Sequence, residues 1–350
     1  MFYQILNSFL KQTDPEVAHE YAIKFLKQNI IPFDFFKFTA DQSLKTKVFG
    51  IDFDNPIGLA AGFDKNAEVY NSIFKLGFGF SEVGTITPEP QDGNPKPRVF
   101  RLNSDQAIIN SLGFPNEGMN KIYERIENNP KKSVLGINIG PNKENATKQD
   151  DYLRCIEKFY PLADYITINI SSPNTPNLRK LHDKKKILDL INILQKFKNN
   201  SKEKKAIIFK LSPNLNISEI NDLSEIFLEK KIDGLILTNT TVEGRELLED
   251  ENKNKQGGLS GYPLNLISNR IIKNFYTNFN GVIPIIGVGG VSDGLTAYEK
   301  IKCGASLLQL YTAIVFKGPY VASKINKELS NLIKKDGLKN ISEAIGVNTN

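Results

Sequence analysis

The most constraining feature of this 350-residue chain is an alternation, from residue 46 onward, between short apolar runs and helical stretches. The runs are β-branched or apolar, and the stretches between them repeat apolar residues with helical periodicity, which is typical of βα units around a parallel sheet. We expect eight strands, at residues 57–61, 80–85, 135–139, 165–169, 206–211, 234–238, 284–288 and 306–309. Eight parallel strands close a barrel, so the sequence predicts an α/β fold of the (β/α)8 TIM barrel class.

A doubly wound open sheet is the alternative fold, but no GxGxxG nucleotide fingerprint follows the first expected strand. Residues 46–350 exceed the roughly 250 residues of a typical barrel, and the surplus lies at residues 86–116 and 242–262. The alternating segment 47–54 predicts a short hairpin before the first barrel strand. Between the strands, helices are clearest at residues 184–197, 217–229 and 294–303.

Residues 1–45 are expected to form a helical hairpin that precedes the barrel domain of residues 46–350. Two amphipathic helices fit this start, because apolar residues recur with i, i+3, i+4 spacing at Phe2, Ile5, Leu6, Phe9 and Leu10, and again at Val17, Ala18, Tyr21, Ala22, Phe25 and Leu26. Thr13 or Asp14 is expected to cap the second helix, with Pro15 in its first turn.

The apolar face of this helical hairpin has two interpretations. It packs on the barrel, or it lies on a membrane surface. The second interpretation rests on apolar residues that follow the hairpin and would otherwise leave a large patch uncovered: Ile30, Ile31, Phe33, Phe35, Phe36 and Phe38.

Composition excludes several other classes of protein. No apolar run approaches the roughly 18 residues that span a bilayer, and an N-terminus that contains Asp14, Glu16 and Glu20, with no arginine before Arg98, fits neither a secretory signal nor a transit peptide. Two cysteines and two histidines, His19 and His182, lack the spacing of metal ligands, so we expect no disulfide framework and no metal site. The net charge of +6 is weak support for nucleic acid, and it suits an anionic substrate, a phosphate-bearing cofactor or an acidic lipid surface equally well.

Polar residues follow the expected strands at the end where a barrel of this kind has its active site. Each residue alone has an ordinary explanation as a cap or a turn residue, but six strand ends together predict a polar site. These amides, hydroxyls and two lysines lie in residues 61–66 and 84–85, at Asn138, in residues 169–176, at Lys210 and in residues 238–240.

Glycine-rich segments lie near the last two strands, where barrels bind phosphate with backbone N–H groups. Gly287-Val288-Gly289-Gly290 ends the seventh expected strand, and Gln309-Leu310-Tyr311-Thr312 ends the eighth. Residues 257–261 add a second flexible, donor-rich segment. The sequence therefore predicts a phosphate-bearing cofactor or substrate.

These motifs, in this order, resemble the dihydroorotate dehydrogenases, in their membrane-associated, quinone-linked class. The resemblance covers nearly the whole chain, and the run Asn169-Ile170-Ser171-Ser172-Pro173-Asn174-Thr175-Pro176 is its most specific part. It implies FMN-dependent oxidation of (S)-dihydroorotate to orotate, with a membrane quinone as electron acceptor, in de novo pyrimidine (UMP) biosynthesis. The other matching segments are Asp14-Pro15-Glu16 with His19-Glu20 and residues 58–62, 136–140, 238–241, 257–261, 284–290 and 316–319.

The resemblance also implies roles for individual residues. Ser172 corresponds to the catalytic base, which removes the C5 proton while the C6 hydride passes to flavin N5. A serine needs help to act as a base, and Thr175 and a water are candidates for a proton relay. Lys65 is implied as a catalytic residue at both flavin and substrate. The implied flavin contacts are Ala61, Gly62, Phe63, Asp64, Lys65, Thr85, Asn138, Asn169, Lys210, Thr238, Gly261, Gly290, Tyr311 and Thr312. The implied substrate contacts are Lys65, Asn110, Ser111, Leu112, Gly113, Phe114, Asn169, Asn174, Asn239 and Thr240.

Two positions depart from the family pattern, since Phe63 replaces a leucine and Ser111 replaces a frequent arginine. His19 and Arg101 resemble residues of the family's quinone tunnel, although His19 also suits a helix surface or cap. The implied partners are dihydroorotate and orotate, a membrane quinone and membrane lipid, with no nucleic acid. The implied location is peripheral, on the cytoplasmic face of the cell membrane.

Three alternative functions stay open. The soluble class of the family, which uses fumarate or NAD, has cysteine where this chain has Ser172. A tRNA-modifying flavin barrel would carry a basic tail, which residues 341–350 do not provide. A non-catalytic barrel that uses its helical hairpin only for membrane association would purify without yellow flavin absorbance.

Overall fold

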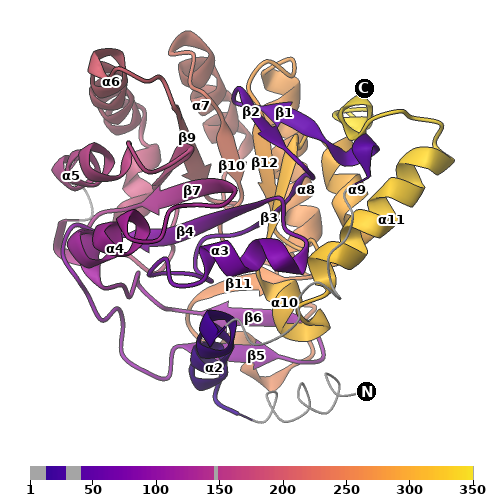
Figure 1. Ribbon diagram of the computed structural model, residues 1–350, viewed down its shortest axis with the longest axis horizontal. Coiled ribbons are helices and arrows are strands. Elements are labelled where there is room, and N and C mark those ends of the chain that lie inside the picture. The colour runs from indigo at the N-terminus through magenta and orange to yellow at the C-terminus, as the bar shows by residue number, and fades with distance from the viewer. Residues whose placement is uncertain (1–12, 29–40, 146–148, 350) are drawn as a thin grey trace.

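The chain forms a closed barrel of eight parallel strands surrounded by helices (Figure 1). The structure is a computed structural model that describes residues 13–28, 41–145 and 149–349. All eight expected strands are present, with bounds close to the predicted ones, so the predicted barrel is confirmed. In their order around the barrel they are β10 (Leu235–Leu237), β12 (Ile285–Val288), β13 (Leu307–Leu310), β3 (Ile57–Leu59), β4 (Phe80–Ile86), β7 (Val134–Ile139), β8 (Tyr165–Asn169) and β9 (Ala206–Leu211).

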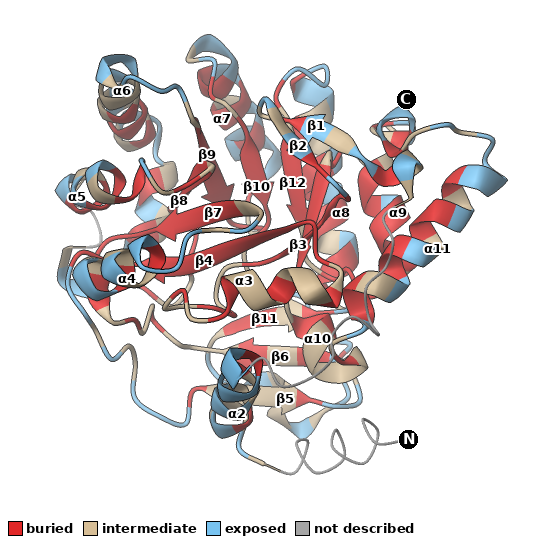
Figure 2. Cartoon of the chain, in the orientation of Figure 1, coloured by how far each residue is buried: buried red, intermediate tan, exposed pale blue. Residues whose placement is uncertain are grey.

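Helices cover the outside of the barrel, and local sequence sets several of their starts. Asp183 accepts hydrogen bonds from the backbone N–H groups of Lys185 and Lys186 at the start of α6, and Asn216 forms a capping box with Glu219 at the start of α7. The strands are buried and the outer helix faces are exposed (Figure 2), as amphipathic periodicity predicts. The helices are α3 (Tyr70–Ile73), α4 (Gly118–Glu127), α5 (Asp150–Phe159), α6 (Lys184–Asn200), α7 (Ile217–Glu229), α8 (Leu264–Asn278), α9 (Gly294–Lys302), α10 (Thr312–Lys317) and α11 (Val321–Lys335).

A two-stranded hairpin closes the N-terminal end of the barrel. Its strands, β1 (Thr46–Val48) and β2 (Ile51–Phe53), confirm the hairpin expected at residues 47–54. The Phe53 ring packs edge-on against Phe80, the first residue of β4, with ring centroids 5.2 Å apart. The ring centroids of Phe49 and Tyr165, the first residue of β8, are 6.2 Å apart. Apolar side chains therefore fill this end of the barrel.

A three-stranded antiparallel sheet lies beyond the C-terminal ends of the barrel strands. It consists of β5 (Val99–Leu102), β6 (Ala107–Asn110) and β11 (Gly258–Gly261), in the order β11-β6-β5. The two surplus segments of the sequence thus pair with each other. Their position outside the barrel repeat is confirmed, but the sequence analysis assigns no strand to either of them.

Helix α2 (Pro15–Gln28) lies beside this sheet (Figure 1). The carboxylate of Asp14 accepts hydrogen bonds from the backbone N–H groups of Glu16 at 2.9 Å and Val17 at 3.1 Å. Asp14 is therefore the cap and Pro15 the first helical residue, as predicted. The other expected helix, around residues 2–10, and the apolar run at residues 30–38 lie outside the described residues.

Only part of the apolar face predicted for α2 is buried against the rest of the molecule. On α2 the buried residues are Ala18, Ile23 and Leu26, and the exposed large apolar residues are Val17, Tyr21 and Phe25.

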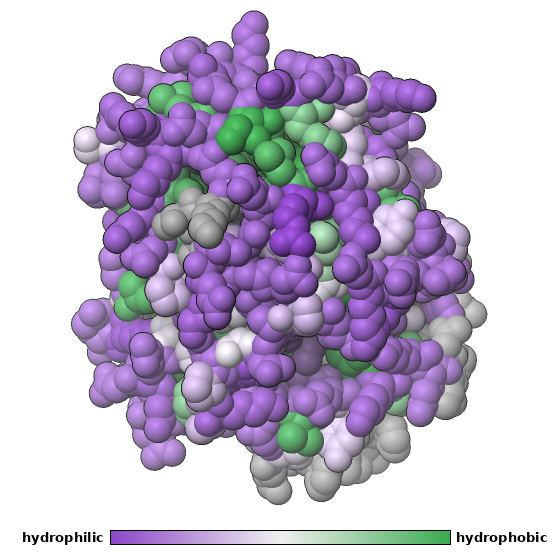
Figure 3. All heavy atoms as spheres, turned by 90° about the vertical axis from the view of Figure 1, so that its left-hand side faces the viewer, coloured by the Kyte–Doolittle hydropathy of each residue, from purple (hydrophilic) through white to green (hydrophobic). Residues whose placement is uncertain are grey.

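Within the part of the chain that the structure describes, no helix combines the length and the apolar character needed to cross a membrane. The face of the molecule on the side of α4, α5 and α6 is mostly hydrophilic, with its hydrophobic residues in separate patches (Figure 3).

Candidate active site

A cavity of about 2100 Å³ opens at the C-terminal ends of the barrel strands, bounded by the three-stranded sheet, α2 and α10. Every barrel strand except β7 contributes to its wall, either directly or through the loop that follows it. The structure brings nearly all of the predicted site residues together here. Only three of them are not part of the lining: Asn138, Ser111 and Thr175.

A buried carboxylate below the cavity organises the inside of the barrel. Glu82 of β4 is fully buried and accepts hydrogen bonds from the side chains of Asn138 (2.8 Å), Tyr165 (3.0 Å), Thr167 (3.0 Å) and Gln309 (2.9 Å). Four donors from three strands, β7, β8 and β13, satisfy a group that would be costly to bury alone. Glu82 is not among the residues predicted from the sequence, because a charged residue within a short strand also suits an exposed strand face.

A chain of hydrogen bonds connects this carboxylate to the loop that follows β8. Asn138 Oδ1 accepts from Thr85 Oγ1 at 2.7 Å, and Thr85 Oγ1 in turn accepts from Asn169 Nδ2 at 2.9 Å. Asn169 Oδ1 accepts from Ser171 Oγ at 3.1 Å, which accepts from Asn239 Nδ2 at 2.9 Å. These hydrogen bonds fix the orientation of the side-chain amides of Asn138, Asn169 and Asn239. Asn138 does not line the cavity, but it holds Thr85, which does.

Two lysines bring positive charge to the wall. Lys210 of β9 is buried, and its burial lowers its pKa, while the charge of Glu82 acts in the opposite direction. Burial lowers the pKa of Lys65 to about 8, and Glu16 of α2 acts in the opposite direction. Lys65, in the loop between β3 and α3, is therefore mostly protonated at neutral pH.

Asp64, next to Lys65, serves its own loop. Its two carboxylate oxygens accept hydrogen bonds from the backbone N–H groups of Glu68 at 2.7 Å and Val69 at 2.8 Å. Burial raises the pKa of Asp64 to about 6 despite these hydrogen bonds. The carboxylate thus holds the β3–α3 loop, which carries Lys65, in place.

Ser172 is buried on the cavity wall in the loop after β8. Its Oγ accepts a hydrogen bond from the backbone N–H of Asn174 at 3.2 Å, and the Asn174 side chain donates to the backbone oxygen of Asn110 at 3.0 Å. Arg179 bonds the backbone oxygens of Ser171 at 3.1 Å and of Thr240. These bonds join the loop to the three-stranded sheet and to the loop after β10.

The predicted proton relay finds no direct support in this geometry. Thr175 is buried, and its backbone oxygen accepts from the N–H of Leu178 at 3.3 Å. Among the described residues no hydrogen bond joins its side chain to Ser172, so the relay through Thr175 stays a prediction.

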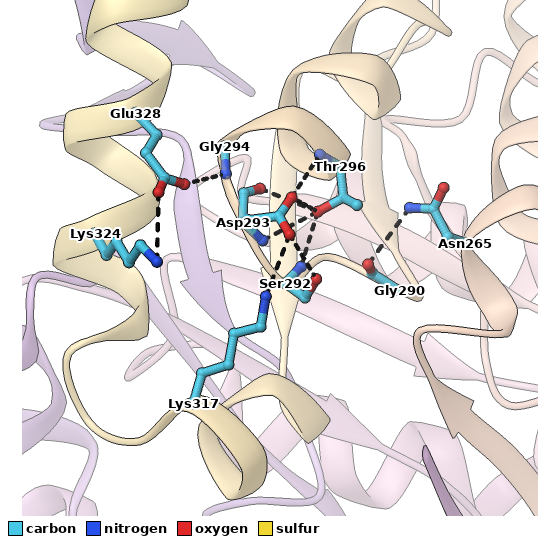
Figure 4. Close-up of polar contacts among 9 residues, drawn as sticks. All are labelled: Asn265, Gly290, Ser292, Asp293, Gly294, Thr296, Lys317, Lys324 and Glu328. Carbon is cyan, nitrogen blue, oxygen red and sulfur yellow. Dashed lines mark hydrogen bonds and ion pairs between the residues drawn. The ribbon is translucent and has the colours of Figure 1, made fainter. Parts of the chain in front are cut away.

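The glycine turn after β12 lies between α8 and α9. Gly289 and Gly290 have φ angles of 115° and 73°, a left-handed region that favours glycine. Nearby, Asp293 caps α9 by accepting from the N–H of Thr296 at 3.0 Å, and Lys317 of α10 lies 3.2 Å from the Asp293 carboxylate (Figure 4). The ion pair joins the loop that carries the turn to the helix that follows β13.

Helix α2 covers the outer part of the cavity, and two arginines of the segment 86–116 hold it there. Arg98 is buried and donates from Nε and Nη2 to the carboxylate of Glu16, over 3.0 to 3.2 Å. Arg101 donates from Nη1 to the backbone oxygen of Thr13 at 2.6 Å. These polar contacts fix the helix over the opening, in addition to the packing of its buried residues Ile23 and Leu26 on the core.

An aromatic cluster lies between α2 and the barrel. The His19 ring packs edge-on against Phe63 with centroids 5.2 Å apart, and Phe63 packs edge-on against Tyr311 at 5.5 Å. Burial, and then the charge of Lys65, lower the pKa of His19 to about 3. His19 is therefore neutral at physiological pH, and burial raises the pKa of the Tyr311 hydroxyl.

A family model described as dihydroorotate dehydrogenase matches residues 43–333. The chain belongs to the dihydroorotate dehydrogenase family. It is 45% identical over 338 residues to "Dihydroorotate dehydrogenase (quinone)" from Bartonella henselae, with 95% of this chain and 92% of that protein covered. It is 42% identical to "Dihydroorotate dehydrogenase (quinone), mitochondrial" from Mus musculus, with 95% and 87% covered.

Solved structures lead to the same family. The crystal structure of ligand-free dihydroorotate dehydrogenase from Eimeria tenella superimposes with a TM-score of 0.92 at 38% identity, covering 96% of this chain and all of that one. The ferulenol complex of the same enzyme gives a TM-score of 0.92 with 95% of each chain covered. The expected family and the expected barrel are confirmed, and membership makes the chain an oxidoreductase of a flavin-dependent family.

The cavity wall has the chemistry that a flavin of this family requires. Three buried oxygens on the wall have no hydrogen-bond partner among the described residues: Thr238 Oγ1, Thr240 Oγ1 and Gln309 Oε1. Leaving a buried polar group unpaired costs about 1–3 kcal/mol. A ligand with both N–H and carbonyl groups, such as a flavin ring or a pyrimidine, satisfies such atoms, so the residues fit the group.

Proposed function

We propose that this chain oxidises (S)-dihydroorotate to orotate with FMN and passes the electrons to a membrane quinone, as a step of de novo pyrimidine (UMP) biosynthesis. The observation that carries the proposal is the position of Ser172, buried on one cavity wall with Lys65, Lys210 and the predicted amides. Serine at this position favours the quinone-linked class over the soluble class. The Bartonella henselae and Mus musculus relatives, both named as quinone-linked enzymes, support the same choice.

The substrate pocket is formed where three loops meet. Asn110 and Asn174, joined by a hydrogen bond, face the cavity together with Asn239. Amides offer both donors and acceptors, as a ring with two carbonyl and two N–H groups requires. Lys65 pairs with the substrate carboxylate, because a protonated lysine on a mostly apolar wall binds a carboxylate strongly. The other substrate contacts that we propose are Ser111, Leu112, Gly113, Phe114, Asn169 and Thr240.

Ser172 acts as the base that takes the proton from C5 of the substrate. An unassisted hydroxyl is a poor base at neutral pH, but the N–H of Asn174 donates to its Oγ at 3.2 Å and stabilises negative charge there. The hydroxyl proton leaves through a water, with Thr175 as a second candidate. The buried position of Ser172 strengthens these electrostatic interactions.

When bound, FMN would supply N5 as the acceptor for the C6 hydride and would be the electron carrier between substrate and quinone. Lys210 stabilises negative charge on a reduced flavin. Gly290 and Gly261 leave room for a phosphate group close to the backbone. The other residues that we propose to hold the cofactor are Ala61, Gly62, Phe63, Asp64, Thr85, Asn138, Thr238, Tyr311 and Thr312.

Quinone reaches the cavity beneath α2. The inner residues of this helix and the aromatic cluster of His19, Phe63 and Tyr311 line the outer part of the cavity. The exposed side chains of Val17, Tyr21 and Phe25 provide an apolar contact for lipid. We therefore place the enzyme peripherally, on the cytoplasmic face of the cell membrane.

Anaerobic stopped-flow mixing with dihydroorotate tests this function. We expect bleaching of the flavin absorbance, followed by rapid reoxidation by a short-chain quinone and not by fumarate or NAD. Reoxidation by fumarate or NAD instead would place the chain in the soluble class. A yellow protein that dihydroorotate does not bleach would contradict the substrate, and a colourless protein would favour a non-catalytic barrel.

A further inference from the structure

A fully buried lysine lies behind the glycine turn that follows β12. Lys300 of α9 has no exposed surface, and its Nζ donates to Ser268 Oγ at 3.1 Å and to Asn269 Oδ1 at 2.6 Å. Both partners are neutral, and among the described residues no carboxylate forms an ion pair with this lysine. Burial lowers the pKa of Lys300 to about 7. A buried ammonium with only neutral partners is costly, which raises the question of what it does.

One branch of hydrogen bonds runs from Lys300 to the residue before the turn. The ammonium group only donates, so Ser268 Oγ accepts from it and uses its own proton elsewhere. That proton is donated to the backbone oxygen of Val288 at 2.6 Å. The same oxygen also accepts from the N–H of Thr238 at 2.9 Å. The carbonyl of Val288 is therefore fixed in direction from two sides.

A second branch runs to the end of the turn. Because Asn269 Oδ1 faces the ammonium, its Nδ2 points away and donates to Asn265 Oδ1 at 3.2 Å. Asn265 Nδ2 then donates to the backbone oxygen of Gly290 at 3.4 Å (Figure 4). Because Lys300 donates to both Ser268 and Asn269, it sets the direction of the side-chain hydrogen bonds that continue from these two residues.

The two carbonyls determine where the N–H groups of the turn point. In a trans peptide the N–H points opposite to the C=O of the preceding residue, and both peptides concerned are trans. With the carbonyls of Val288 and Gly290 held toward α8, the N–H groups of Gly289 and Val291 point the other way. Gly289 and Val291 both line the cavity, so both N–H groups lie at its wall, on the side away from α8.

The first glycine of the same motif makes room for this lysine. A Cβ at Gly287 would lie 2.8 Å from Cδ and 2.9 Å from Cγ of Lys300, closer than real Cβ atoms approach. The aliphatic stem of the lysine therefore crosses β12 over a glycine. Gly287 serves the lysine, while Gly289 and Gly290 form the turn.

We infer that Lys300 is a positioning residue for an anion site: through Ser268 and Asn269 it aims the N–H groups of Gly289 and Val291 at the phosphate group of the cofactor. The inference rests on the proposed function for the identity of the anion. It assigns a role to a side chain that touches neither substrate nor cofactor.

A comparison of two ligands tests this role, because riboflavin has the ring of FMN without its phosphate. The full chain, freed of flavin, is titrated with each ligand, and binding is followed by flavin fluorescence. In Lys300→Met we expect the Kd for FMN to rise about tenfold, the loss expected for one or two hydrogen bonds to a charged group, while the Kd for riboflavin changes less than about twofold. Lys302→Met, on the same helix with Nζ over the Tyr298 ring, is the matched control and should change neither Kd.

Equal weakening of FMN and riboflavin in Lys300→Met would show a general structural role and overturn the inference, as would no change in either Kd. If this variant does not fold, Ser268→Ala removes one branch only, and the expected change is a rise of about threefold in the FMN Kd alone. An unchanged FMN Kd in Ser268→Ala would also overturn it. If the wild-type chain binds neither flavin, the proposed function fails first, which distinguishes the two failures.

Discussion

The two ends of the barrel are both covered by segments that precede its first strand, but they are covered in different ways. At the N-terminal end, the β1–β2 hairpin places Phe53 and Phe49 against the first residues of the barrel strands, within a cluster of buried apolar side chains. At the C-terminal end, α2 lies over about 2100 Å³ of open space and is held at its edge by Arg98 and Arg101. The comparison shows that one end is built for stability and the other for chemistry.

The cost of this difference lies at the C-terminal end. Buried lysines with lowered pKa values and unpaired buried oxygens are unfavourable in the folded protein, whereas apolar packing at the hairpin is favourable. Proteins often lose some stability where groups are arranged for activity. Substitutions at the two ends should therefore separate activity from stability.

The largest expected effect is on catalysis at the open end. Ser172→Ala should slow flavin reduction by dihydroorotate by about 10²- to 10⁴-fold, the contribution of a general base, and leave flavin bound. The free energy of unfolding should change by less than about 1 kcal/mol. Anaerobic stopped-flow and urea denaturation measure the two quantities. Ser306→Ala, just before β13, is the matched control, and unchanged flavin reduction in Ser172→Ala would contradict the base.

The next effect is the reverse one, at the filled end. Phe53→Ala should lower the free energy of unfolding by about 3–5 kcal/mol, the usual loss for a buried phenylalanine, because its ring is 2% exposed and packs on Phe80. Turnover per folded molecule should change less than about twofold. Urea denaturation measures the stability, and flavin reduction measures the turnover. Phe25→Ala, at an exposed position of α2, serves as the control for stability. A large loss of turnover in Phe53→Ala would contradict the separation of stability from activity between the two ends.

A smaller effect on stability and on quinone binding is expected at the contact between Glu16 of α2 and Arg98. Glu16→Gln removes the carboxylate that Arg98 contacts, which should cost about 1–3 kcal/mol in the free energy of unfolding and raise the KM for quinone several-fold. Since the charge of Glu16 raises the pKa of Lys65, the pH profile of dihydroorotate binding should shift to lower pH. Lys96→Met, 3.9 Å from the Glu16 carboxylate and largely exposed, is the control. An unchanged KM for quinone would separate α2 from the quinone step.

The smallest effect is a pH dependence that belongs to the open end. The pKa of His19 is lowered from 6.5 to about 3, so between these values the unfolded chain binds a proton that the folded chain does not. Stability should therefore fall as the pH drops below about 6.5, by about 1 kcal/mol at pH 5.5. His19→Phe should lose this part of the slope in urea denaturation at pH 7.5 and 5.5. His182, whose pKa is lowered to about 4, contributes equally to both proteins, so an unchanged slope in His19→Phe would assign the dependence elsewhere.

The sequence predicts the barrel well because its signal is local. Each of the eight strands is a short apolar run bounded by turn residues, and parallel strands buried on both faces need little more. The three-stranded sheet leaves no comparable signal. Its β11 pairs with β6 from a distant part of the chain, and four-residue strands such as β5, with only Leu102 buried, have no clear alternation.

The candidate site divides in the same way. Residues that end strands or form the strand-four motif, such as Ser172, Lys65 and Asn174, can be picked out in the sequence, and all three line the cavity. Glu82 and Lys300 are not visible, because a charged residue in a strand or helix usually faces solvent. Only the folded structure shows that both side chains are buried. Glu82 is surrounded by four donors inside the barrel, and Lys300 meets two neutral acceptors between α9 and α8. Supporting residues of this kind depend on distant parts of the chain.

The late position of β11 in the chain has a consequence for synthesis. On a ribosome the chain emerges from its N-terminus, so β1 and β2 can pair as soon as Phe53 is free. The pairing of β6 with β11 must wait until Gly258 is made, and β13 joins β3 later still, after Leu310. Contacts between distant segments of the chain form slowly. The hairpin of the filled end therefore pairs early, whereas the sheet over the cavity pairs only after Gly258 is made and the barrel closes only after Leu310.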